Sequence, residues 1–338
     1  MHYLITGHTG FKGAWLTLWL TSQGHRVSGL SLDPVAGSLY ESAAIGELVS
    51  TDARVDIRDA SATAVVVAEV APDVVVHLAA QPLVRESYRS PRLTFETNVM
   101  GTLNLLEAVA ATPAVRAQVI VTTDKVYRNM NQVQGYAETA ALGGDDPYSS
   151  SKAMADILTQ SWTTSFPGTP TAIARAGNVI GGGDVSSDRL IPDLLRAFSA
   201  GAPAELRFPG AVRPRQHVLD CLSGYVALAD ALLAGSGRGE WNFGPGEASF
   251  VPVGEMASAA AEMWGSGARW RTVGGDHPHE ANLLALDASK AERELGWSNR
   301  LLFPTSLEWT IAWFRSVDGG ADPRQTTLDQ IAEFGTLP

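Results

Sequence analysis

A short apolar strand that runs through regularly spaced glycines into a helix restricts the folds open to this chain more than any other feature. Residues 2–6 are the strand candidate, Gly7, Gly10 and Gly13 follow, and residues 11–22 are the helix candidate. Glycine permits a tight turn and close approach of a ligand to the backbone, and a helix N-terminus attracts anions. The turn therefore predicts a parallel α/β sheet whose first strand opens onto a site for a diphosphate-containing dinucleotide.

The first 175 or so residues alternate apolar runs with helical stretches, a pattern typical of a doubly wound parallel sheet. Further strands are expected at residues 26–32, 54–56, 73–78, 118–123 and 171–175, and further helices at residues 62–70, 92–111 and 147–165. We therefore predict an α/β fold with a dinucleotide-binding domain over residues 1–177 and a smaller mixed α/β lobe, mainly for substrate, over residues 178–338. Residues 219–245 are regular enough to return to the sheet domain.

Composition excludes several classes of partner. The 338 residues carry 36 acidic and 25 basic side chains, a formal net charge of -11, which disfavours nucleic acid and anionic membranes. The single cysteine, Cys221, excludes an internal disulfide and suits a reducing compartment such as the cytoplasm. We expect no signal peptide or membrane span, because Lys12 interrupts the apolar stretch after the first strand. His277 and His279 lack a third ligand, so we expect no metal site.

A second group of polar residues marks the end of the strand at 118–123. Thr123, Asp124 and Lys125 place a hydroxyl, an acid and a potential base in sequence, and Tyr148 and Lys152 begin a later helix. Residues four apart share a helix face, so the ammonium of Lys152, together with the positive ring of a bound nicotinamide, should stabilise the phenolate of Tyr148 and make it a base toward an alcohol. Asp124 and Lys125 would add the acid and base that removal of water requires, although they could also cap a turn and be solvated.

The cofactor site is predicted from the residues that follow each strand. An acid after the second strand would bind a free ribose hydroxyl and repel a phosphate. Ser31 stands where that acid is expected and Asp33 lies two residues on, so NAD is favoured and NADP stays open. The predicted cofactor residues are Gly7, Thr9, Gly10, Phe11, Lys12, Gly13, Asp33, Asp56, Ile57, Leu78, Ala79, Ala80, Asn98, Thr122, Tyr148 and Lys152.

Together these motifs resemble the extended short-chain dehydrogenase/reductase family of nucleotide-sugar enzymes. Longer segments are similar to members that dehydrate a nucleotide hexose, CDP-glucose above all: residues 7–16, 77–88, 97–108, 174–184, 188–193 and 213–220. The similarity extends to about residue 314. The chain departs from it at Arg215, where a tryptophan is expected, and at residues 128–134, which lack the expected glutamate and tryptophans.

The resemblance implies a Rossmann fold and an NAD-dependent 4,6-dehydratase. Tyr148 would take the proton of the C4 hydroxyl, sharing a hydrogen bond with Thr123, while hydride leaves C4. Lys125 would then remove the C5 proton, and Asp124 would protonate the departing C6 hydroxyl. Return of the hydride to C6 would give a 4-keto-6-deoxyhexose. The substrate residues implied are Gln81, Asn178, Arg189, Leu190, Arg213 and His217, with the arginines holding the diphosphate.

The resemblance also implies a homodimer joined by a four-helix bundle. The helices concerned would be residues 92–111 and 147–165, which carry the apolar Leu103, Leu106, Ile157 and Trp162. A nucleotide-sugar 4-epimerase is the alternative function, although an epimerase has no use for an acid and a base at C6 and C5. A non-catalytic dinucleotide-binding sensor is less favoured, because it has no need of the Tyr-x-x-x-Lys pair.

Overall fold

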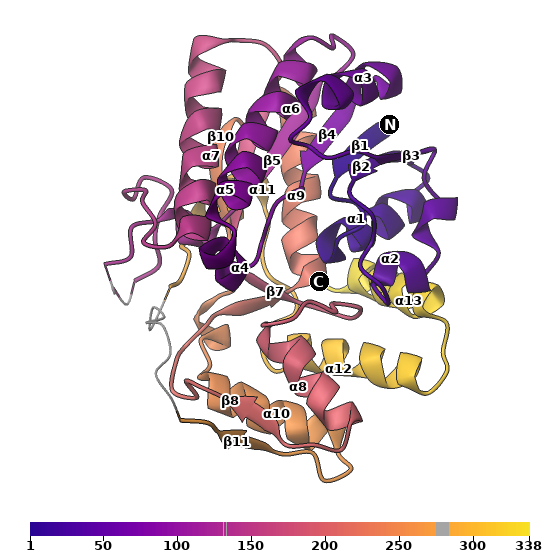
Figure 1. Ribbon diagram of the computed structural model, residues 1–338, viewed down its shortest axis with the longest axis vertical. Coiled ribbons are helices and arrows are strands. Elements are labelled where there is room, and N and C mark those ends of the chain that lie inside the picture. Colours follow the sequence, from indigo (N-terminus) through magenta and orange to yellow (C-terminus); the bar gives the residue numbers. More distant parts are fainter. Residues whose placement is uncertain (131, 133, 275–283) are drawn as a thin grey trace.

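The computed structural model describes residues 1–130, 132, 134–274 and 284–338. A seven-stranded parallel sheet with helices on both faces forms the larger part, and a smaller lobe lies below the carboxyl ends of the strands (Figure 1). His277 and His279 lie outside the described residues. Within the described ranges, no group of three or more metal-ligating side chains is found, and no helix has the length and apolarity to cross a bilayer.

The elements divide between the two parts. The sheet consists of β1(His2–Thr6), β2(Arg26–Ser31), β3(Thr51–Arg54), β4(Val74–His77), β5(Ala117–Thr123), β6(Thr171–Ala176) and β10(Gly239–Phe243). Around it lie α1(Phe11–Ser22), α2(Leu39–Ser42), η1(Ile45–Glu47), α3(Ala60–Val70), α4(Val84–Arg89), α5(Pro91–Phe95), η2(Glu96–Met100), α6(Gly101–Ala110), η3(Asp124–Val126), α7(Pro147–Ser165), α9(Val218–Leu233), α11(Ser289–Leu295) and α13(Pro323–Thr336). The smaller lobe contains β7(Asn178–Ile180), α8(Leu190–Ser199), β8(Ala204–Leu206), β9(Arg215–His217), η4(Glu247–Ser249), α10(Val253–Trp264), β11(Trp270–Thr272) and α12(Thr305–Asp318).

Strand order places the site. The order across the sheet is β10-β6-β5-β4-β1-β2-β3, so the direction of winding reverses between β1 and β4. In open parallel sheets a ligand binds beyond the carboxyl ends of the strands at this reversal. The turn after β1 and the loops after β4 and β5 therefore face one region, into which the smaller lobe also reaches.

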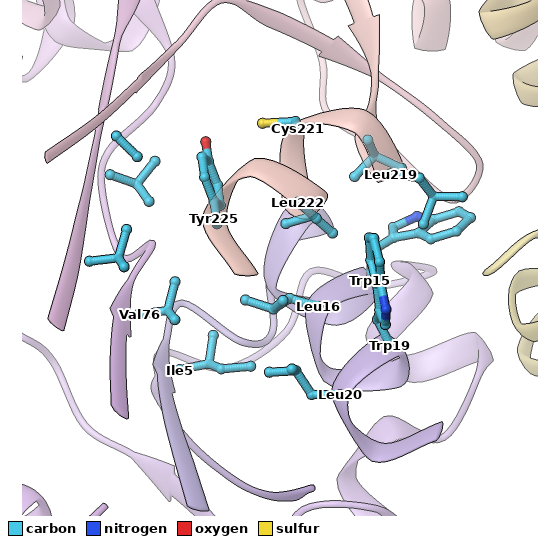
Figure 2. Close-up of a cluster of buried hydrophobic side chains, with 14 of the residues drawn as sticks. Ile5, Trp15, Leu16, Trp19, Leu20, Val76, Leu219, Cys221, Leu222 and Tyr225 are labelled. Atoms are coloured by element: carbon cyan, nitrogen blue, oxygen red, sulfur yellow. The ribbon is translucent and has the colours of Figure 1, made fainter. Parts of the chain in front are cut away.

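Alternating side chains of β1 feed two separate cores. Ile5 is fully buried against α1 and α9, where Trp15 and Leu222 also lie (Figure 2). Leu4 points to the opposite face and packs with side chains of α3 and α6. This alternation, expected for a strand buried on both faces, fixes the register of β1 and so the position of the turn that follows it. Cys221 is a free thiol buried in the first core (Figure 2).

Gly182 lies at a tightly packed contact between the sheet domain and the smaller lobe. Gly182 follows β7 and accepts a hydrogen bond of 2.9 Å from the indole nitrogen of Trp15 on α1. The ring of Trp313 lies against its Cα, where a Cβ atom would be 2.0 Å from the ring. Trp313 is itself held by a 2.9 Å hydrogen bond to Thr327. The packing at this joint therefore leaves no room for a side chain at residue 182.

We expect Gly182→Ala to destabilise the protein by about 1–3 kcal/mol, because the added methyl group must displace a buried indole. Urea unfolding measures the change. Gly168→Ala is the matched control, because a Cβ atom there meets nothing within 4 Å. Equal stability of the two variants would contradict the tight packing of Trp313 on Gly182.

Several bounds differ from those predicted. The helix predicted at residues 92–111 is divided into α5, the π-helical segment η2 and α6. The strand predicted at residues 54–56 is β3, which ends at Arg54 and pairs Thr51 to Arg54 with β2. It is a polar edge strand, so it has no apolar pattern by which it could be found. α9 and β10 lie with the sheet, and β10 pairs with β6.

Candidate active site

A cavity of about 1020 Å³ opens at the carboxyl ends of the strands and extends into the smaller lobe. Pockets for single small ligands are usually about 300–1,000 Å³. The volume of this cavity thus lies at the upper end of that range, as expected for a large ligand such as a dinucleotide.

The glycine turn forms a backbone cradle on one wall. Gly7 has φ +75°, and a Cβ atom there would lie 2.8 Å from the amide nitrogen of Ala79 after β4. A Cβ atom at Gly13 would lie 2.2 Å from the carbonyl oxygen of Gly7. The cradle leads into the N-terminus of α1, whose first amides have no intrahelical acceptor. The close-packed backbone and the helix terminus fit the diphosphate of a dinucleotide cofactor.

Side chains of the turn attach it to the neighbouring strands. His8 is buried, with its Nε2 2.7 Å from a carboxylate oxygen of Asp52. The Thr9 hydroxyl bonds the Ser31 hydroxyl at 2.7 Å and donates to the Leu32 carbonyl at 3.1 Å. Thr9, Ser31 and Leu32 line the cavity.

Asp33 is placed differently from the prediction. Its carboxylate is 89% exposed and lies 3.9 Å from the Nε of Arg54, outside the cavity wall. The chain turns outward after Ser31, so the acid two residues beyond the strand end faces solvent.

The remaining cofactor residues from the strand ends lie in the cavity wall: Gly10, Phe11, Lys12, Asp56, Ile57, Leu78, Ala79, Ala80 and Thr122. The carboxylate of Asp56 is held by two guanidinium nitrogens of Arg58, at 3.0 and 2.6 Å. Lys12 donates a 3.1 Å hydrogen bond to the hydroxyl of Tyr225, and desolvation lowers its pKa.

Asn98 and Gln81 shape the wall from behind and are not part of it. The side chain of Asn98 accepts from the amide of Gln81 at 2.8 Å and donates to its carbonyl at 3.1 Å. It also donates to Ser151 on α7 at 2.8 Å. The Gln81 side chain donates to Thr94 at 2.8 Å. Both side chains thus make hydrogen bonds that hold the loop after β4 against α5 and α7. Neither side chain lines the cavity, in contrast to the predictions of Asn98 as a cofactor contact and of Gln81 as a substrate contact.

The carboxyl group at the end of β5 is buried, and its pKa is raised. Asp124 is 4% exposed and accepts a 2.8 Å hydrogen bond from the Thr123 hydroxyl. Burial raises the pKa of Asp124, and the opposing effects of Lys125, Thr123 and Arg213 do not cancel it. A carboxyl group whose pKa is raised can donate a proton near neutral pH. Thr123, Asp124 and Lys125 all line the cavity.

Tyr148 and Lys152 face the same cavity from the first turns of α7. The helix starts at Pro147 and is capped by Asp146, whose carboxylate accepts from the Ser149 amide at 2.9 Å. The Lys152 ammonium donates to the Val121 carbonyl at 2.8 Å, and burial followed by the charge of Lys12 lowers its pKa to about 7.

In the protein alone, the pKa of Tyr148 lies above its usual value. Desolvation raises it to about 12, against the effects of Thr123 and Arg189. The Lys152 ammonium is directed at the backbone carbonyl of Val121. In the protein alone, Tyr148 is therefore a phenol at neutral pH.

Four of the six predicted substrate residues line the far half of the cavity: Asn178, Arg189, Leu190 and Arg213. Asn178 begins β7 and lies opposite Arg215 of β9 in a short parallel pair. Its amide nitrogen is 3.5 Å from the carbonyl oxygen of Pro214.

His217 is not a substrate contact. It is fully buried, with its ring 6.0 Å from that of Trp15 and 5.9 Å from that of Trp309. Its Nδ1 accepts a 3.3 Å hydrogen bond from the Leu219 amide at the start of α9. Residues two apart in a strand share a face, so His217 would be expected on the same side of β9 as Arg215. The strand ends at His217, and its side chain instead packs against the aromatic rings of α1 and α12.

Two buried histidines should make the fold sensitive to acid. Burial lowers the pKa of His77 and of His217 to about 3. Both are neutral in the folded protein, whereas the unfolded chain takes up protons below about pH 6.5. Stability is therefore full above that pH and falls by about 1.4 kcal/mol for each histidine and each pH unit toward pH 3.

We expect the free energy of unfolding in urea to be about 2–3 kcal/mol lower at about pH 5.5 than at about pH 7 because of these histidines. In His217→Gln the fall should be smaller by about half of this amount. Comparing the two proteins cancels the titration of all other groups. An identical fall in both would contradict the buried neutral state of His217.

The sequence patterns did not predict a cluster at the cavity rim. Arg85 of α4 lies 2.7 Å from Asp188, and Arg207 lies 3.9 Å from the same carboxylate. All three line the cavity, as does Arg215. No local motif distinguishes them from surface charges; Arg215 is notable only because the resemblance predicts a tryptophan at that position.

Comparisons with known proteins agree with this geometry. Residues 3–244 match the model of the NAD dependent epimerase/dehydratase family. The chain is 44% identical over 329 residues to the CDP-glucose 4,6-dehydratase of Salmonella typhimurium, covering 93% of this chain and 91% of that protein. It is 30% identical over 335 residues to a dTDP-glucose 4,6-dehydratase of Xanthomonas campestris pv. campestris, covering 92% of each. A crystal structure of the Streptomyces venezuelae dTDP-glucose 4,6-dehydratase with NAD bound matches with a TM-score of 0.82 and 26% identity, over 96% of this chain and 100% of that one.

Proposed function

The chain belongs to the NAD-dependent epimerase/dehydratase family, and on this basis we infer that it catalyses the 4,6-dehydration of a nucleotide sugar with NAD as cofactor. CDP-glucose is the proposed substrate, because the 44% identical relative is named for it. The observation that carries the reaction type is the buried Asp124, with its raised pKa, beside Lys125 in the cavity that also holds Tyr148. An acid and a base at this point serve an elimination and have no task in a 4-epimerase.

Each residue has a proposed step. NAD, when bound, supplies the acceptor for the hydride of C4, the donor of hydride to C6 and a positive ring beside the phenol of Tyr148. Tyr148 takes the proton of the C4 hydroxyl, and Thr123 orients that hydroxyl. Lys125 removes the C5 proton, which the C4 ketone has made acidic. Asp124 gives its proton to the C6 hydroxyl, so that water leaves and a 4-keto-5,6-ene remains. Once C6 has regained a hydride, Lys125 returns its proton to C5, and the product is a 4-keto-6-deoxyhexose.

The far half of the cavity suits the rest of the substrate. Arg189 and Arg213 are assigned to the diphosphate, because a guanidinium presents forked donors to phosphate oxygens. Asn178 is assigned to the same group, because it lines the same cavity as these arginines.

A panel of nucleotide glucoses deuterated at C4 tests the function. We expect CDP-glucose to give a product with the alkaline absorbance of a 4-keto sugar and with deuterium at C6. Recovery of hexose with inverted C4 would favour the epimerase. Failure of every member of the panel to react would favour the sensor.

We also propose that the protein is a cytoplasmic homodimer. Exposed apolar side chains gather on α5, η2 and α7: Leu93, Met100, Met154 and Ile157. Trp162 and Leu103 are half-buried, whereas Leu106, expected on this face, is fully buried in the core. Light scattering of the purified protein tests the dimer.

The cytoplasmic location is supported by the single free thiol, which a reducing compartment keeps reduced.

A further inference from the structure

Arg215 is a buried cation in the cavity wall. It begins β9, is only 6% exposed and lines the cavity. Its Nη1 donates to the carbonyl oxygen of Arg213 at 2.9 Å and contacts the sulfur of Met256 at 3.6 Å. Both partners are neutral, and no carboxylate within the described part of the chain forms an ion pair with it.

An isolated buried charge is costly to a protein, by several kcal/mol even after the surroundings relax. A guanidinium also has five N–H donors in a fixed fork, and the contacts described above involve Nη1 alone. Burial, followed by the charge of Arg213, lowers the pKa of Arg215 to about 9, which still leaves it charged at neutral pH. Among the residues that the structure describes, this cation in the cavity wall therefore has no anionic partner.

Two other arginines that line the cavity have a carboxylate partner, unlike Arg215. Arg85 and Arg207 share the carboxylate of Asp188. Arg215 instead lies opposite Asn178 in the β7–β9 pair, two residues after Arg213, and all of these residues line the cavity. The unbalanced charge thus lies among the residues assigned above to the diphosphate.

We propose that Arg215 is a third guanidinium for the substrate diphosphate and sets the preference of this enzyme for a nucleoside diphosphate over the nucleoside. The inference rests on the proposed function, in which the substrate is a nucleotide sugar. A glucosyl group is uncharged, so the diphosphate is the anion that such a substrate brings into the cavity. The forked donors of arginine bind two phosphate oxygens at once, which lysine does not do.

The experiment is a calorimetric titration of wild type, Arg215→Met and Arg215→Lys with CDP and with cytidine. We expect Arg215→Met to bind CDP about 10- to 100-fold more weakly, the loss of a charged hydrogen-bonding pair, and to bind cytidine as wild type does. Arg215→Lys should lie between the two. With CDP-glucose, KM should rise in parallel while kcat stays within about twofold, because the group binds ground state and transition state alike.

Arg315→Met is the matched control. Arg315 lies on α12, is exposed and donates to a carbonyl oxygen, that of Met263, at 3.1 Å, so its loss should change neither affinity. If Arg215→Met fails to fold, Arg215→Lys decides by the same contrast between CDP and cytidine.

Three outcomes would overturn the inference. Unchanged CDP affinity in the Arg215 variants would mean that the charge does not reach the phosphates. Equal loss for CDP and cytidine would mean that Arg215 only shapes the lobe. A wild type that binds none of CDP, dTDP, UDP and GDP would overturn the proposed function itself, and the inference with it.

Discussion

Replacing Tyr148 with phenylalanine lowers product formation by about 10²- to 10⁴-fold, the usual contribution of a positioned acid or base. The block falls on the first step, because Tyr148 is the residue proposed to take the C4 hydroxyl proton. The nicotinamide therefore stays oxidised when enzyme and substrate are mixed. Stopped-flow absorbance of reduced nicotinamide, together with kcat for the 4-keto product, measures both effects.

Tyr3→Phe is the control for this variant. The Tyr3 hydroxyl is buried without a hydrogen-bond partner, so its removal alters a tyrosine without altering the cavity. Wild-type formation of reduced nicotinamide by Tyr148→Phe would assign the base to another residue.

Asp124→Asn stops the cycle at a later point. Asparagine preserves the shape of the buried carboxyl group and can accept the hydrogen bond of Thr123, but it has no proton to give to the leaving hydroxyl. We expect reduced nicotinamide to form and accumulate, while dehydration falls by about 10²- to 10⁴-fold. Exchange of the C5 hydrogen with D2O should continue, because Lys125 is intact. Mass spectrometry of recovered sugar measures that exchange.

Asp230→Asn provides the comparison for an acid outside the cavity. Asp230 lies on α9 and also has a pKa raised by burial, so this variant separates the effect of position from that of an altered carboxyl group. Dehydration at the wild-type rate by Asp124→Asn would remove Asp124 from the elimination. Loss of reduced nicotinamide in the same variant would place Asp124 in the oxidation instead.

Local sequence signals predicted the elements that carry the chemistry. The turn at Gly7 was predictable because its backbone conformation and its contact with Ala79 both demand glycine. α7 was predictable because Asp146 and Pro147 are standard signals of a helix start. The division of the helix at residues 92–111 was not predictable. Asn98 lies in the π-helical segment and binds the loop after β4, and nothing in the neighbouring sequence indicates that contact.

Positions that depend on distant contacts were also missed. Spacing alone places Lys152 beside Tyr148, but the direction of the Tyr148 pKa in the protein depends first on how deeply the phenol is buried, which only the fold shows. His217 lies in a strand beside residues that line the cavity, so the sequence gives no reason to exclude it as a ligand contact. Only the fold shows that it packs against the indoles of two helices. The sequence shows that Arg215 departs from the expected tryptophan, but only the structure shows that no acid among the described residues pairs with it.

The smaller lobe and the sheet domain meet through a buried hydrogen bond from Trp15 to Gly182, and also through the half-exposed ion pair of Arg85 and Asp188. Surface ion pairs contribute about 0–1 kcal/mol and weaken as salt is added. The contact between Arg85 and Asp188 should therefore weaken as salt is added, whereas the buried bond between Trp15 and Gly182 should not. Release of the sugar nucleotide is expected to become faster as ionic strength rises.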